Sequence, residues 1–125
     1  MSEVGWDYVG VPQRWVDGDT NWMYVEKQID NGFRVFTTIR HLLEYRIWGC
    51  DTPERGKPNY ALASARSAEL CPVGLPVKVQ TFKPRPEDKY GRWLVRIMLD
   101  DGRWLDEVLI AEGLAVPYFG GPKGP

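Results

Sequence analysis

The chain has 125 residues, which is enough for one domain with one hydrophobic core. Sixteen Lys and Arg residues against 17 Asp and Glu give a formal net charge of -1, which excludes binding of nucleic acid through an overall positive field. A nucleic-acid partner would need a local basic patch, and the richest candidate segment runs from Lys83 to Arg96.

The N-terminus and the cysteines bear on where the protein works. No apolar run approaches the ~18 residues of a membrane span, and Met1-Ser2-Glu3 lacks the basic and apolar regions of a secretory signal. We therefore expect a cytoplasmic protein without membrane association, and secretion stays open if a longer chain precedes this sequence. Cys50 and Cys71 have neither metal-ligand nor redox spacing, so we expect two buried, reduced thiols.

The first half of the chain is typical of strands. An irregular strand is predicted over residues 7–16, because Gly10 and Pro12 interrupt it. Strands over 21–29 and 33–39 are joined by the turn Asp30-Asn31-Gly32 and should form a hairpin. Residues 42–48 form a further strand, or continue the third one past a bulge near Arg40 and His41.

The second half mixes strands with two helices. Residues 60–70 are rich in Ala, Leu, Glu and Arg and predict a helix that Pro72 ends, and residues 104–112 predict a short amphipathic helix before Gly113. Strands are expected over 76–82 and 92–99, an exposed loop over 83–88 and a flexible tail over 119–125. This order predicts one β-rich α+β domain over residues 1–125, an OB-fold five-stranded Greek-key barrel with two short helices.

Three short motifs combine acidic and basic residues. They are Val16-Asp17-Gly18-Asp19-Thr20, Arg46 followed by Asp51-Thr52-Pro53-Glu54, and Asp88-Lys89-Tyr90-Gly91-Arg92. Each alone is typical of ordinary structure: a tight turn, the start of a helix or turn, and a polar loop. Together, carboxylates can hold a divalent cation such as calcium while arginines bind phosphate oxygens. The set therefore indicates metal-assisted cleavage of a phosphodiester.

In this order and with these separations, the three motifs and Gly113-Leu114-Ala115 resemble the staphylococcal nuclease (thermonuclease) family from about Arg14 to Tyr118. The resemblance implies an OB-fold barrel with calcium-dependent phosphodiesterase activity on DNA and RNA. Cleavage between phosphorus and the 5′ oxygen would leave 3′-phosphate ends. We expect a thermonuclease-like endonuclease that works as a monomer.

The resemblance also implies roles for single residues. The implied calcium ligands are the carboxylates of Asp19 and Asp51 and the backbone carbonyl of Thr52, with Asp17 outside the ligand sphere. The implied catalytic residues are Glu54, which activates or orients the attacking water, and Arg46 and Arg92, which bind the phosphate and stabilise its growing charge. The implied substrate contacts are Lys89, Tyr90 and Tyr118.

Two other functions stay open. One is a related domain with little catalytic activity that binds nucleic acid or protein, and retention of the five charged residues argues against it: Asp19, Arg46, Asp51, Glu54 and Arg92. The other is a plain single-strand-binding OB domain, for which clustered carboxylates are a liability because they repel phosphate.

The aromatic residues and the histidine receive plainer interpretations. His41 is the only histidine, and one histidine cannot form a zinc site. Six tryptophans could stack on bases, but Trp48 and Trp93 lie among apolar residues and are expected in the core. The other four receive no assignment: Trp6, Trp15, Trp22 and Trp104.

Overall fold

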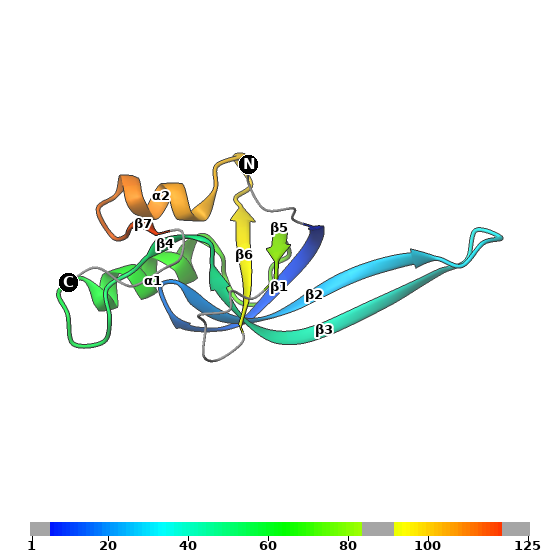
Figure 1. Cartoon of the computed structure of the whole chain (residues 1–125), viewed down its shortest axis with the longest axis horizontal. Coiled ribbons are helices and arrows are strands. Elements are labelled where there is room, and N and C mark those ends of the chain that lie inside the picture. Colours follow the sequence, from blue (N-terminus) through cyan, green and yellow to red (C-terminus); the bar gives the residue numbers. More distant parts are fainter. Residues whose placement is uncertain (1–5, 84–91, 119–125) are drawn as a thin grey trace.

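The computed structural model describes residues 6–83 and 92–118, which form a closed five-stranded barrel with two helices (Figure 1). The barrel order is β1-β2-β3-β6-β5, from β1 (Trp6–Asp17), β2 (Thr20–Asp30), β3 (Phe36–Ile47), β5 (Val77–Phe82) and β6 (Trp93–Met98). A second, two-stranded sheet joins β4 (Gly49–Asp51) to β7 (Val116–Tyr118). Helices α1 (Tyr60–Leu70) and α2 (Leu105–Ala111) lie beside this small sheet. The predicted β-rich OB-fold barrel is confirmed.

The boundaries of the predicted strands and helices agree closely with the structure, apart from two differences in the third strand; β4 and β7 were not predicted. The predicted bulge near Arg40 and His41 is wrong, because β3 is one strand whose pairing with β2 runs without a shift from Thr20↔Arg46 to Asp30↔Phe36. Register shifts occur in β1 instead, one of them between Pro12 and Arg14, where proline cannot donate to the ladder. The third strand also begins at Phe36 rather than at residue 33.

The hairpin of β2 and β3 extends far beyond the barrel (Figure 1). Pairing of β1 with β2 ends at Glu26, and β6 pairs with β3 only over residues 45–47, so residues 27–39 project as a two-stranded arm. Phe33 and Arg34 at its tip have positive φ angles of 54° and 60°, which explains why the strand starts later than predicted. A two-stranded ribbon has no core of its own, and Phe33 is fully exposed.

Alternate side chains of β2 and β3 fill the interior of the barrel. Odd-numbered positions face inward, and Met23, Val25, Tyr45 and Ile47 are all buried there. Each fully buried aliphatic side chain of this kind contributes roughly 1.5–3 kcal/mol. Asn21 is the polar exception on this inner face, buried with neither side-chain polar atom hydrogen-bonded among the described residues.

The two cysteines are free and buried, as predicted. Burial, reinforced by the negative charge of Asp100, raises the pKa of the Cys71 thiol to about 12, so this thiol stays protonated and unreactive. Trp93 packs half-buried against the core, and Trp48 is half-buried with its ring 6.1 Å from that of Phe82. Within the described part of the chain, no helix has the length and apolar character needed to cross a membrane.

Candidate active site

The turn between β1 and β2 is held against helix α1. A Cβ atom at Gly18 would lie 2.9 Å from Thr52 Cγ2 and 3.0 Å from Ala63 Cβ, so only glycine allows this close approach. The Ser67 hydroxyl donates a 2.7 Å hydrogen bond to the carbonyl of Gly18. Sequence reasoning missed the role of Ser67, which the small residues at Gly18 and Ala63 indicate only once the helix position is known.

This turn places Asp19 as a buried, ionised carboxylate. The amide of Thr52 donates to Asp19 Oδ2 at 3.1 Å, and the Thr20 hydroxyl donates to Oδ1 at 3.2 Å. Burial opposes ionisation of Asp19, but the hydrogen bond with Asp17, the charge of Arg46 and the Thr52 amide together hold its pKa below the ordinary value. Both carboxylate oxygens of Asp19 therefore act only as hydrogen-bond acceptors.

Asp17 behaves in the opposite way. Burial, the hydrogen bond with Asp19 and the charge of Asp19 raise the pKa of Asp17 to about 6. Its Oδ1 also accepts a 3.1 Å hydrogen bond from the Asp19 amide, which closes the turn. The pair thus divides into one carboxylate that stays charged and one that takes up a proton near neutrality.

Arg46 is fixed from several directions. Its Nη1 donates to the carbonyl oxygens of Ile47 at 3.1 Å and Cys50 at 3.2 Å, and its Nη2 donates to Asp51 Oδ1 at 3.1 Å. The same Nη2 lies 3.6 Å from Asp19 Oδ2, and the side chain is only 11% exposed. The guanidinium is therefore preorganised, as a group that stabilises developing charge must be.

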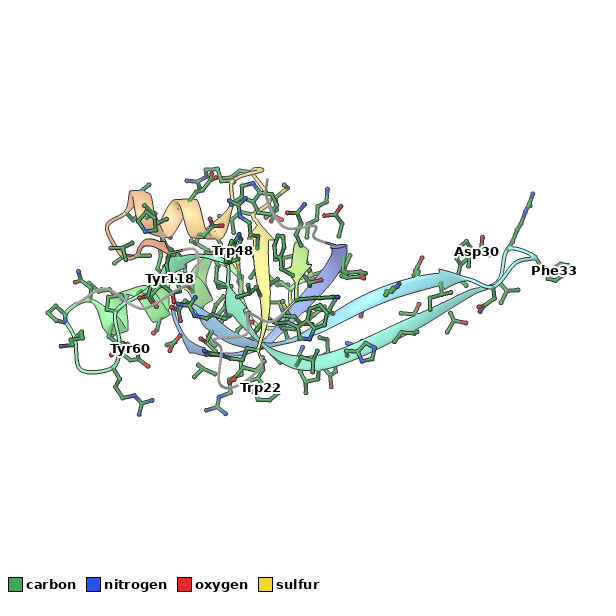
Figure 2. The ribbon with its side chains drawn as sticks, in the orientation of Figure 1. Trp22, Asp30, Phe33, Trp48, Tyr60 and Tyr118 are labelled. Carbon is green, nitrogen blue, oxygen red and sulfur yellow. The ribbon has the colours of Figure 1, made fainter. Side chains whose placement is uncertain are left out.

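The pairing of β7 with β4 places Tyr118 next to Arg46. Strand β7 pairs with β4 so that Val116 lies opposite Asp51 and Tyr118 opposite Gly49. The Arg46 guanidinium carbon lies 5.0 Å from the centre of the Tyr118 ring, a cation–π contact. Figure 2 shows Tyr118 on the helix side of the molecule, at the opposite end from Phe33.

Arg92 joins the cluster through Thr20. Its Nη1 donates to Thr20 Oγ1 at 3.4 Å, and Thr20 in turn donates to Asp19. Thr20 thus links Arg92 to Asp19, and it also lies opposite Arg46 in the β2–β3 ladder. The structure thus brings together the following sequence-predicted residues: Asp19, Arg46, Asp51, Thr52, Arg92 and Tyr118.

The remaining predicted site residues are Glu54, Lys89 and Tyr90. Glu54 is exposed, in a turn closed by a 3.0 Å hydrogen bond from the Lys57 amide to the Glu54 carbonyl. Lys89 and Tyr90 lie outside the described residues.

The two predicted carboxylate ligands lie close together. Asp19 Oδ2 and Asp51 Oδ1 both approach the same nitrogen of Arg46, at 3.6 and 3.1 Å, so two carboxylates converge on one region. Thr52 is buried beside them. Among the residues that the structure describes, no group of three or more His, Cys, Asp and Glu side chains gathers that could hold a metal ion, so a cation here would need other ligands as well. Calcium could use the two carboxylates, a backbone carbonyl, waters and a substrate oxygen.

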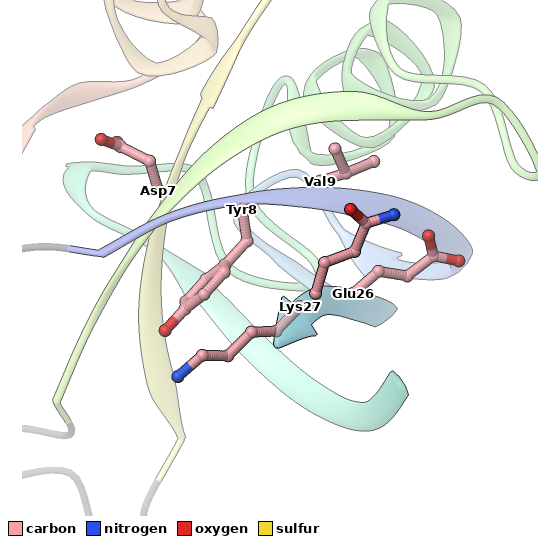
Figure 3. A pocket seen from close by; sticks show the side chains of 6 residues that line it. Asp7, Tyr8, Val9, Glu26 and Lys27 are labelled. Atoms are coloured by element: carbon pink, nitrogen blue, oxygen red, sulfur yellow. The ribbon is translucent and has the colours of Figure 1, made fainter. Parts of the chain in front are cut away.

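A separate groove of about 570 Å³ is lined by residues 7–9 of β1 and 26–28 of β2 (Figure 3). The side chains of Tyr8 and Lys27 lie side by side there, with the Lys27 nitrogen 6.0 Å from the centre of the Tyr8 ring. The groove contains none of the predicted site residues. It is therefore not the centre of the predicted chemistry.

The fold and the charge cluster together define the class of protein: an OB-fold domain that places two arginines beside one buried and one half-buried carboxylate. The family model for staphylococcal nuclease homologues matches residues 44–123, and the chain belongs to this family. A search of curated proteins gives no match to the chain. The matched segment includes Arg46 and Asp51 but begins after the turn that carries Asp19, and the contacts described above join the two parts.

Proposed function

We propose that the chain is a calcium-dependent phosphodiesterase that hydrolyses DNA, RNA or both at the bond between phosphorus and the 5′ oxygen, leaving 3′-phosphate ends. The observation that carries the proposal is the position of the Arg46 guanidinium between the carboxylates of Asp19 and Asp51. Carboxylates beside the phosphate contact would weaken a surface that only binds nucleic acid, because they repel the phosphate groups.

The arginines bind and stabilise the phosphate in this proposal. A phosphodiester resists attack because its negative charge repels nucleophiles, and Arg46 and Arg92 offset that charge. Arg46 is held rigidly by backbone carbonyls, so it has little reorganisation to undergo as charge grows on the phosphoryl oxygens. Tyr118 covers one face of its guanidinium and restricts access of water.

The carboxylates divide into two roles. Asp19 and Asp51, with the carbonyl of Thr52, would hold the cation, which neutralises substrate charge and polarises the phosphoryl group when bound. Glu54 accepts the proton of the attacking water, and its exposure leaves it open to solvent. The water oxygen bonds to phosphorus as the bond to the 5′ oxygen breaks, and the departing 5′ oxygen takes a proton from solvent. The phosphate stays on the 3′ oxygen of the other fragment.

With two protein carboxylates, the site should bind calcium weakly, at ~0.1–1 mM. The calcium midpoint of activity measures this directly. A micromolar or tighter midpoint would contradict a site of this composition.

Product analysis tests the proposed reaction. A fluorescent oligonucleotide of DNA and one of RNA are incubated with the protein in calcium and, in parallel, in EGTA, and the fragments are identified by mass spectrometry. The proposal predicts fragments with 3′-phosphate ends in calcium and intact substrate in EGTA. Fragments with 5′-phosphate ends would contradict the mechanism, and binding without cleavage would favour a binding module.

A further inference from the structure

One edge of β3 is unpaired over most of its length in the part of the chain that the structure describes. The neighbours of β3 in the barrel are β2 and β6, and β6 reaches it only over residues 45–47. Residues 36–44 therefore pair with β2 on one side and with no strand on the other. This open edge runs along the arm that projects from the barrel (Figure 1).

The backbone groups of even-numbered residues point out from this edge. At the arm tip, the Asn31 amide donates to the Val35 carbonyl at 2.8 Å. Beside the barrel, the Ile47 amide donates to the Asp19 carbonyl, also at 2.8 Å. Both bonds join odd-numbered positions on the β3 side to the β2 side, and hydrogen-bonded and non-hydrogen-bonded pairs alternate along an antiparallel ladder. The N–H and C=O groups of five residues therefore face outward: Phe36, Thr38, Arg40, Leu42 and Glu44.

The open edge is suited to pairing with another chain. Edge strands are commonly protected by proline, lysine or a bulge. Residues 36–44 contain no proline or lysine, and their register with β2 has no shift. Phe36, Leu42 and Leu43 are 60%, 44% and 39% exposed. The edge therefore combines outward-facing backbone groups with exposed apolar side chains.

The sequence of this edge matches itself in one antiparallel register. When Ile39 lies opposite the partner's Ile39, Phe36 lies opposite the partner's Leu42. Phe36 and Leu42 are both outward-facing residues, as a hydrogen-bonded pair requires. Just before the strand, Val35, which is 56% exposed, comes opposite the partner's Leu43. The exposed apolar residues of the two copies thus cover one another, and cross-strand apolar pairs stabilise a sheet.

The same register keeps like charges from lying directly opposite each other. Thr38 lies opposite the partner's Arg40, and each Arg40 is already paired with Glu26 of its own chain at 3.0 Å. A register centred on Arg40 would place two guanidiniums directly opposite, which is destabilising. A register centred on His41 would place Leu42 opposite the partner's Arg40. The register centred on Ile39 is therefore the best match.

We propose that this edge joins two copies of the chain in a two-fold dimer, β3 against β3, with Ile39 on the axis. A contact between identical patches closes on itself and does not grow into a filament. The pairing turns two ribbons, each marginally stable by itself, into one four-stranded sheet. The copies exchange roughly eight backbone hydrogen bonds, within the range of a typical interface. The dimer differs from the monomer expected from the sequence, and it does not depend on the proposed reaction.

Mass measurement over a range of concentrations tests for the dimer. The full chain is followed by sedimentation equilibrium from micromolar to millimolar concentration. We expect the mass to rise with concentration from the 14.4 kDa of one chain to twice that value. A mass that stays at 14.4 kDa at millimolar concentration, or that passes beyond a dimer, would overturn the proposal.

Thr38→Pro tests the hydrogen bonds between the copies. It removes an N–H that faces the partner and leaves the bonds between β2 and β3 in place, so the arm should stay folded. The two-fold axis removes two hydrogen bonds at once, so the dimer Kd should rise by roughly 5- to 150-fold. Thr38→Val keeps the N–H and should dimerise as wild type does. Circular dichroism checks the fold of both variants, and an unchanged Kd for folded Thr38→Pro would overturn the pairing.

Cysteine cross-linking tests the register without removing a hydrogen bond. Facing residues of a non-hydrogen-bonded antiparallel pair have Cα atoms about 4.5 Å apart, within the range of a disulfide. Ile39→Cys should therefore form a covalent dimer rapidly with diamide, while the native thiols of Cys50 and Cys71 are buried. His41→Cys is the matched control, because its thiols would face each other only in a shifted register. Cross-linking of Ile39→Cys no faster than that of His41→Cys would contradict the proposed axis.

Discussion

Arg46 and Arg40 lie on the same face of β3, three pairing steps apart, and both form ion pairs of similar length. Arg46 Nη2 lies 3.1 Å from Asp51 Oδ1, and Arg40 Nε lies 3.0 Å from Glu26 Oε1. Their surroundings differ, since the side chains of the first pair are 11% and 18% exposed and those of the second 51% and 34%.

The difference shows that burial, rather than distance, decides what an ion pair does. An exposed pair is worth about 0–1 kcal/mol, because water screens it and two long side chains must be ordered. Removing one partner of a buried pair costs about 3–5 kcal/mol, because the other charge stays buried and unpaired. The small sheet of β4 and β7 covers one end of the hairpin, and the arm has no such cover among the described residues.

Arg46→Ala should have the largest effect. Loss of a preorganised donor should lower turnover by at least ~100- to 1000-fold. Without its guanidinium, Asp19 and Asp51 repel each other, so the free energy of unfolding in EGTA should fall by about 3–5 kcal/mol. Turnover in calcium and urea unfolding in EGTA measure the two effects.

Arg46→Lys is the control for that prediction. It keeps the positive charge but loses the planar fork, so stability should largely return while turnover stays low. Wild-type turnover by Arg46→Lys would contradict the assigned role of the guanidinium.

Glu54→Gln should separate chemistry from stability. Loss of the proton acceptor should lower turnover by ~100- to 10,000-fold. Because Glu54 is exposed, the free energy of unfolding should change by no more than about 1 kcal/mol. Turnover close to wild type would remove Glu54 from the mechanism.

Asp17→Asn should change how stability depends on pH. The folded-state pKa of about 6 lies above the ordinary 3.8, so the folded protein holds a proton that the unfolded chain releases. This stabilising contribution is complete below about pH 4 and is lost as pH rises through about 6. Asparagine mimics the protonated carboxyl, so in EGTA the variant should gain stability over wild type across that range.

The gain should reach about 1 kcal/mol above pH 7, a value reduced for the partial exposure of Asp17 to solvent. Urea unfolding at a series of pH values measures it. A stability difference that does not vary between pH 4 and pH 7 would show that Asp17 holds no such proton.

Arg40→Ala should have the smallest effect. The exposed pair with Glu26 predicts a loss of at most about 1 kcal/mol, and less in high salt. Urea unfolding at low and high sodium chloride measures it. A loss above 2 kcal/mol that salt does not reduce would place Arg40 among the buried charges.

Much of the fold was predictable from the sequence. Helix α1 has the predicted limits of residues 60–70, because its composition favours a helix and Pro72 ends it. Strands β4 and β7 were missed, because three residues are too few for an alternation pattern.

The candidate site was predictable only in part. The motifs predicted Asp19, Arg46 and Asp51 as neighbours, and the structure brings them together. The support of Gly18 by Ser67 joins residues 49 positions apart, and the coverage of Arg46 by Tyr118 depends on the pairing of two short strands. Such contacts carry no local pattern.

The most direct test is the initial rate of oligonucleotide cleavage in calcium and in EGTA, measured side by side for wild type and Glu54→Gln. Calcium-dependent phosphodiester hydrolysis at this site predicts cleavage by wild type in calcium, none in EGTA, and a rate at least ~100-fold lower for the variant. No cleavage by folded wild type in millimolar calcium, or an equal rate for both proteins, would contradict it.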